Sequence, residues 1–119
     1  MALEVSTTAH DELVVLALAG EFDVYTVAEF RTELERLGQV DRSVIVDLSG
    51  VTLLDSSGIG ALVTLLNQAR HDGGQVGVIC PHATLRRVFE IAGLRTAFVF
   101  GDSLDAVRNG LSPGANPQQ

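Results

Sequence analysis

Residues 43–66 read SVIVDLSGVTLLDSSGIGALVTLL, and this stretch decides the fold because it joins a strand pattern to a helix pattern. Its first part, Ser43–Leu48, is a short apolar run rich in Val, which is typical of a strand buried on both faces. Ser49-Gly50 predicts a turn or an extended connector. From Ser56 onward, apolar residues recur at intervals of three and four, which predicts a helix with one buried face. These apolar residues are Ile59, Leu62, Val63 and Leu66.

The chain before this stretch predicts two strands and a helix. Leu3–Thr8 alternates apolar and polar residues and Leu13–Ala19 is a continuous apolar run, so the two are expected to form an antiparallel hairpin. Gly20-Glu21 is expected to end the second strand. Asp23 is expected to be the N-cap of an amphipathic helix that ends at the C-cap Gly38.

After residue 66, helices and strands continue to alternate. The helix that starts at Ser56 is expected to stop at Gly73-Gly74. The later elements are predicted to be a strand over Gln75–Cys80, a helix over Ala83–Ile91, a strand over Ala97–Phe100 and a helix from Leu104 to Asn109. Such alternation implies parallel pairing with right-handed crossovers. The sequence therefore predicts one α/β domain over residues 1–110, with a mostly parallel sheet, an antiparallel N-terminal edge strand and a disordered tail over residues 111–119.

Composition narrows the classes of partner. The 119-residue chain has a formal net charge of −7 and no basic run, so it lacks the basic face that nucleic acid or an anionic membrane would require. No signal-peptide pattern is present, and no apolar run approaches the roughly 20 residues that cross a bilayer. The single cysteine, Cys80, allows no internal disulfide and is interpreted as a buried core residue. We therefore expect a cytoplasmic protein that binds neither nucleic acid nor membrane.

Two loops are candidates for the functional site, because ligands of parallel α/β sheets gather beyond the carboxyl ends of the strands. The loops are Gly20–Asp23 and Asp55–Gly60, which would lie side by side if their strands are neighbours. The start of a helix offers unpaired backbone N–H groups that could bind a phosphate. A purely structural role, in which Asp55 or Ser56 caps the helix, would equally explain why these residues are present.

Two further features of these loops favour a binding surface. Gly58 and Gly60 lie in the first turns of a helix, where each glycine lowers helix stability by up to about 1 kcal/mol relative to Ala. Close helix packing or the close approach of another molecule would explain their presence. Phe22 and Ile59, set among acidic residues, are expected to form a docking patch for a protein.

Three segments of the chain carry a resemblance to a known family. Val46–Leu62, which reads VDLSGVTLLDSSGIGAL, resembles the central signature of STAS domains, in particular the stand-alone bacterial anti-sigma-factor antagonists. Leu18–Asp23 resembles the earlier Gly-Glu-Leu-Asp loop of that family, and Phe89–Leu94 followed by Ala97–Phe100 resembles its C-terminal helix and strand. The resemblance implies a STAS-like α/β superhelix. Many members have Leu where this chain has Ile59.

The resemblance also implies a function and a set of site residues. Members bind an anti-sigma factor, often an ATP-dependent serine kinase, and so release a sigma factor for transcription. The kinase phosphorylates a serine that corresponds to Ser56, which breaks the complex, and a phosphatase reverses the modification; the residues alone leave Ser57 open as the acceptor. No cofactor or metal is expected. The partner-binding surface is expected to comprise Glu21, Asp23, Asp55, Ser57, Gly58 and Ile59.

Other functions are less well supported by the residues. A nucleophilic serine needs a base, and of the three histidines only His82 is expected at the same end as Ser56, where it is interpreted as a solvated capping residue. A P-loop and a Gly-x-Ser-x-Gly elbow are absent from the sequence, and the absence of lysine argues against a phosphoaspartate receiver, so no enzyme is expected. Within the same fold, a scaffold or regulatory subunit of a signalling assembly or lipid-transport complex, not regulated by phosphorylation, stays open.

Overall fold

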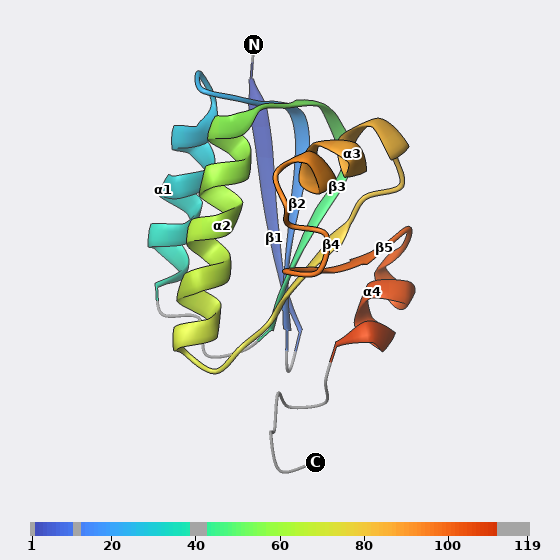
Figure 1. Ribbon diagram of the computed structural model, residues 1–119. Helices are drawn as coiled ribbons and strands as arrows, with labels where there is room; N and C mark the ends of the chain where they lie inside the picture. Colours follow the sequence, from blue (N-terminus) through green and yellow to red (C-terminus); the bar gives the residue numbers. More distant parts are fainter. Residues whose placement is uncertain (1, 11–12, 39–42, 112–119) are drawn as a thin grey trace.

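The computed structural model describes residues 2–10, 13–38 and 43–111. The predicted order of strands and helices is confirmed, and Figure 1 shows it along the chain. The elements are β1 (Leu3–His10), β2 (Leu13–Phe22), α1 (Val27–Leu37), β3 (Ser43–Leu54), α2 (Ser56–His71), β4 (Val76–Ile79), α3 (Ala83–Ile91), β5 (Val99–Gly101) and α4 (Leu104–Gly110). Of the predicted tail, residues 112–119 lie outside the described residues.

The sheet has the predicted pairing. Its strand order is β1-β2-β3-β4-β5, with β1 antiparallel to β2 and every other pair parallel. Because each right-handed crossover steps in the same direction along the sheet, α1, α2 and α3 cover one face and form the main core with it. The helix α4 packs on the other face through Val107, beside Ile45 and Ile79. The middle strands are therefore buried on both faces, as their apolar runs predicted.

The two strands that lead to the site are longer than predicted. The sequence placed their ends at Ala19 and Leu48, but β2 continues to Phe22 and β3 to Leu54 as one parallel ladder with two register shifts. Gly20 lies inside the ladder with φ 115°, and a Cβ there would lie 2.3 Å from the Ala2 carbonyl oxygen. Gly20 therefore permits a close approach of β1 and does not terminate the strand.

The start of α1 was also predicted wrongly. Thr26, not Asp23, occupies the N-cap position, and its side chain makes no cap hydrogen bond. Asp23 closes the preceding turn, where its Oδ1 accepts from the N–H groups of Tyr25 at 2.9 Å and Thr26 at 3.2 Å. The C-cap at Gly38 is confirmed, with φ 73°. The remaining element ends fall within about two residues of prediction, as helix and strand limits commonly do.

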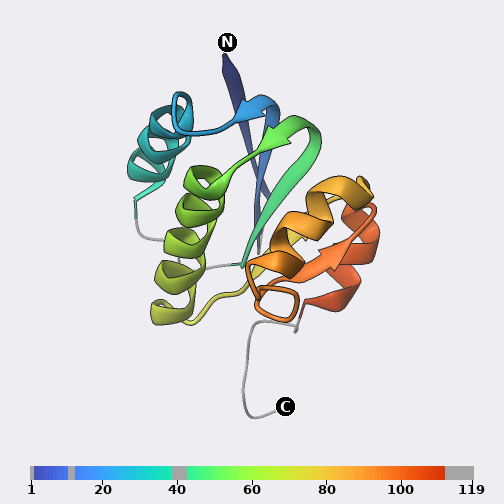
Figure 2. The same cartoon turned by 45° about the horizontal axis from the view of Figure 1, so that its top comes forward.

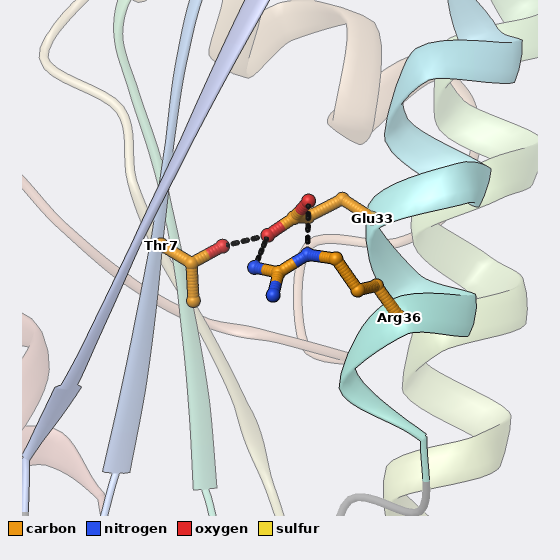
Figure 3. Close-up of polar contacts among 3 residues, drawn as sticks. All are labelled: Thr7, Glu33 and Arg36. Atoms are coloured by element: carbon orange, nitrogen blue, oxygen red, sulfur yellow. Dashed lines mark hydrogen bonds and ion pairs between the residues drawn. The ribbon is translucent and has the colours of Figure 1, made fainter.

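A polar cluster fastens α1 to the edge strand β1 (Figure 3). The carboxylate of Glu33 accepts hydrogen bonds from the Thr7 hydroxyl and from the guanidinium of Arg36. The hydrogen bonds from Arg36 and then Thr7 lower the pKa of Glu33 to about 2.

The single cysteine, Cys80, is a buried core residue as predicted, and burial raises the pKa of its thiol.

Candidate functional site

The two candidate loops lie side by side at the end of the sheet that Figure 2 brings forward. They adjoin because β2 and β3 are parallel neighbours whose last residues, Phe22 and Leu54, are paired. Hydrogen bonds join them directly: the Asp55 N–H donates to the Phe22 carbonyl at 3.3 Å, and the Val24 N–H donates to Asp55 Oδ2 at 3.2 Å. The predicted juxtaposition is confirmed.

One carboxylate holds this arrangement together. Asp55 is the N-cap of α2 in extended conformation, and its Oδ1 accepts from the N–H groups of Ser57 at 2.8 Å and Gly58 at 3.1 Å. Its second oxygen, Oδ2, accepts a hydrogen bond from the Val24 N–H of the other loop. Two of the N–H groups that an anion at this helix start would use are therefore already bound, so the terminus is less free for a phosphate than the sequence suggested.

The two serines differ in their environment. Ser56 is the first residue of α2 and is exposed, whereas Ser57 is half-buried and its backbone is tied to the Asp55 side chain. Ser56 thus presents its hydroxyl to solvent immediately beside the capping carboxylate.

The two glycines of this helix start have opposite explanations. A Cβ on Gly58 would lie 2.8 Å from both the Phe22 carbonyl oxygen and Leu54 Cδ1, so α2 can approach the strand ends only with glycine there. A Cβ on Gly60 would meet nothing within 4 Å, and Gly60 is exposed. Packing inside the domain accounts for Gly58 and leaves Gly60 unexplained.

The predicted apolar docking patch is wrong in its residues. The side chains of Phe22 and Ile59 are 0% and 8% exposed and belong to the core. The apolar side chains that reach solvent at this end of the sheet are instead those of Val24, Tyr25 and Leu53. Sequence reasoning missed them, although two large apolar residues between Asp23 and Thr26, in a turn that polar residues usually fill, were a usable signal.

Asp23 and Thr26 are the buried polar residues within the described ranges, and both serve the β2–α1 loop. The Thr26 hydroxyl donates to the Glu21 carbonyl at 2.6 Å and accepts from the Asp23 N–H at 3.0 Å. Together with the hydrogen bonds that the Tyr25 and Thr26 N–H groups donate to Asp23 Oδ1, these bonds fix the path of the loop from Glu21 to Thr26. Of the predicted site residues, Asp23, Gly58 and Ile59 are therefore buried beneath the surface.

The remaining candidate, His82, does not face the serines. It is the exposed N-cap residue of α3, where its side chain makes no cap bond, and its Nε2 lies 3.0 Å from the Ser49 carbonyl oxygen. Nothing in the described part of the chain groups three or more His, Cys, Asp or Glu side chains as a metal site would. Across those same residues, no helix is both long enough and apolar enough to span a bilayer.

Comparison with known proteins identifies the family. The STAS-domain model matches residues 4–107, so the chain belongs to the STAS-domain family. It is similar to the anti-sigma-B factor antagonist of Staphylococcus aureus, with 32% identity over 96 residues that cover 80% of this chain and 89% of the relative.

Two solved structures show the same fold. A putative anti-sigma factor antagonist from Thermotoga maritima superposes with a TM-score of 0.79 at 19% identity, over 88% of this chain and 92% of the other. The Bacillus cell fate determinant SpoIIAA in its phosphorylated form superposes with a TM-score of 0.68 at 24% identity, over 89% and 98% of the two chains. The predicted fold class is confirmed.

Proposed function

We propose that this chain is an anti-sigma-factor antagonist that binds an anti-sigma factor through the surface around Ser56. Binding releases a sigma factor for transcription, and phosphorylation of Ser56 by the partner ends it until a phosphatase restores the free serine. The observation that carries the proposal is the exposed Ser56 beside Asp55, whose carboxylate joins both loops of the site. The name of the Staphylococcus relative and the phosphorylated form of SpoIIAA support it.

The geometry around Ser56 supports an electrostatic off switch. A phosphoserine carries about −1.5 to −2 charges at neutral pH, and here it would stand next to the Asp55 carboxylate. Because the N–H groups of Ser57 and Gly58 already donate hydrogen bonds to Asp55, they are not available to compensate the charge of the phosphate. In an interface the dianion would also lose its water, and a penalty of only about 2.8 kcal/mol weakens binding a hundredfold.

Accessibility supports Ser56 over Ser57 as the phosphoacceptor. A kinase must reach the hydroxyl, and Ser56 is exposed while Ser57 is half-buried. Gly60 lies one turn along the same exposed face of α2, at the i+4 position, where the missing side chain leaves room for a partner to approach the helix backbone. In this surface Glu21 and Asp55 contribute acidic character, whereas Asp23, Gly58 and Ile59 are buried and hold the loop and the helix in position.

The test uses the Ser56→Ala chain as bait in an extract of its source organism, followed by mass spectrometry of what it captures. We expect an anti-sigma factor with an ATP-binding kinase domain. The captured protein, purified and mixed with ATP, should add one phosphate to the wild-type chain within the peptide that contains Ser56. Ser57→Ala is the matched control and should still be phosphorylated.

Two results would contradict the proposal. A phosphate that maps to Ser57 would move the switch by one residue and remove the argument from exposure. Capture of a membrane-transport or scaffold complex, with no phosphate added by any component, would favour the role of a regulatory subunit that phosphorylation does not control.

A further inference from the structure

Apolar surface is concentrated near Ser56. Within residues 2–10, 13–38 and 43–111, the exposed large apolar side chains are those of Val24, Tyr25, Leu53 and Ile91. Tyr25 is the most exposed of them, at 85%, and it follows Val24, at 58%, in the β2–α1 loop. A single exposed apolar residue is common on protein surfaces, but two adjacent ones of which one is Tyr, a residue enriched at protein interfaces, indicate a contact with another molecule.

The loop that presents Tyr25 is held at almost every residue. Asp23 Oδ1 accepts from the Tyr25 N–H, the Thr26 hydroxyl donates to the Glu21 carbonyl, and Asp55 Oδ2 accepts from the Val24 N–H. Burying polar side chains is costly unless they are hydrogen-bonded, and the described residues bury Asp23 and Thr26 at this one place. The fold therefore holds Val24 and Tyr25 in a fixed position while exposing both to solvent.

We propose that Tyr25, flanked by Val24, is the anchor residue by which this chain recognises its anti-sigma factor; the inference rests on the proposed function and adds the residue that supplies the binding energy. Interface energy is usually concentrated in a few aromatic or arginine anchors that enter a pocket. The loop is already held in place, and a Tyr side chain has only two rotatable χ angles. Binding therefore costs little conformational entropy, which favours affinity.

The charge around Tyr25 indicates the kind of pocket that receives it. The carboxylates of Asp23 and Asp55 hydrogen-bond the loop, and Glu29 lies in the first turn of α1 directly after it. The sequence has no lysine, and its first arginine is Arg31. The complementary surface on the partner is therefore an apolar cleft with basic residues at its rim.

The anchor and the switch belong to one rigid unit. Asp55 caps the helix that begins with Ser56 and also binds the N–H of Val24, next to Tyr25. A partner that binds Tyr25 therefore lies close to Ser56, and we expect it to bury a phosphate added there. This arrangement explains how phosphorylation at the start of α2 can weaken binding through an anchor residue on a different loop.

The experiment measures the affinity of the purified anti-sigma factor for wild type, Tyr25→Ala, Tyr25→Phe and Ile91→Ala by titration calorimetry, with thermal unfolding of each variant. Tyr25→Ala should weaken binding about 30-fold or more, the usual effect of truncating an anchor, with an unchanged melting temperature. Tyr25→Phe should keep most of the affinity because the ring is retained. Ile91→Ala removes another highly exposed apolar side chain, from α3, and should bind as wild type does.

The outcomes separate this proposal from the proposed function. If Ser56→Asp weakens binding and Tyr25→Ala does not, the antagonist role stands and the anchor is overturned. If the wild-type chain binds no anti-sigma factor, both fail. If the wild-type chain forms dimers that Tyr25→Ala dissociates in sedimentation analysis while affinity for the anti-sigma factor is unchanged, the anchor serves a second copy of this chain and the proposal is wrong.

Discussion

At the residue scale, two glycines that lie two residues apart in the same motif do different things. Gly58 is buried where any Cβ would collide with the Phe22 backbone, while Gly60 is exposed to open space. The sequence identified both as costly for a helix, but only the three-dimensional structure separates the one that packing needs from the one that it does not.

The pair yields a matched prediction. Gly60→Ala should stabilise the domain by up to about 1 kcal/mol, because it improves helix propensity without a clash, and should weaken partner binding. Gly58→Ala should instead lower the melting temperature, because the added methyl meets a backbone oxygen that cannot move aside. Thermal unfolding and calorimetry measure both. A Gly60→Ala chain that binds as tightly as wild type would show that the partner does not approach this turn.

Ser56 gives a second residue-scale prediction. Ser56→Ala should leave stability within about 0.5 kcal/mol of wild type, because Asp55 and not Ser56 caps α2. Ser56→Asp should weaken binding to the anti-sigma factor, since it places a second carboxylate beside Asp55. Ser6→Asp adds the same charge at an exposed position on β1 and serves as the control. Equal losses in the two aspartate variants would indicate a general charge effect and not a local switch.

At the scale of elements, the sequence predicted the order and type of the strands and helices and which strands run parallel, because hydrophobic periodicity reports burial directly. It failed at Gly20, which looked like a strand end, and at Asp23, which looked like a helix cap. Both errors have one cause. A glycine or an aspartate signals a local backbone requirement, but which neighbour imposes that requirement depends on tertiary contacts.

The same limit applied to the site. The motif around Ser56 and its neighbour loop were predictable, since parallel strands bring their carboxyl ends together. The assignment of Phe22 and Ile59 to the surface was wrong, because both side chains pack into the core. Tertiary packing decides which apolar residues of a loop are exposed to solvent, and a single sequence does not reveal that packing.

The contact between α1 and β1 supports a prediction on pH. The pKa of Glu33 is lowered to about 2 in the folded chain from an ordinary value of 4.5, so its contribution to stability is present above pH 4.5 and is lost as pH falls toward 2. Glu33→Gln should lower the melting temperature at pH 7, and the difference from wild type should shrink as the pH is reduced. Glu35→Gln, on an exposed position of the same helix, is the control. A difference that is constant from pH 7 to pH 3 would contradict the role of the charge.

At the scale of the whole molecule, charge is the property that a partner meets first. The formal net charge is −7, and the chain up to residue 30 carries no lysine or arginine. A basic partner surface should therefore be attracted from a distance, which raises the association rate at low salt.

Stopped-flow measurement of association with the anti-sigma factor checks this expectation. Raising the ionic strength from about 0.05 M to about 0.5 M shortens the screening length several-fold, so the association rate constant should fall while the dissociation rate constant changes less. Tyr25→Ala should act on dissociation and leave the salt dependence of association in place. An association rate that does not respond to salt would exclude steering by the acidic surface.

The order of the strands in the sheet, β1-β2-β3-β4-β5, is also their order in the chain. Each strand after β1 therefore finds its first partner already synthesised when it leaves the ribosome. Strands that are consecutive in the chain pair at a smaller entropy cost of loop closure than strands separated by a further crossover. The surface around Ser56 is formed by β2, β3 and the start of α2, so it can assemble before the C-terminal third of the protein exists.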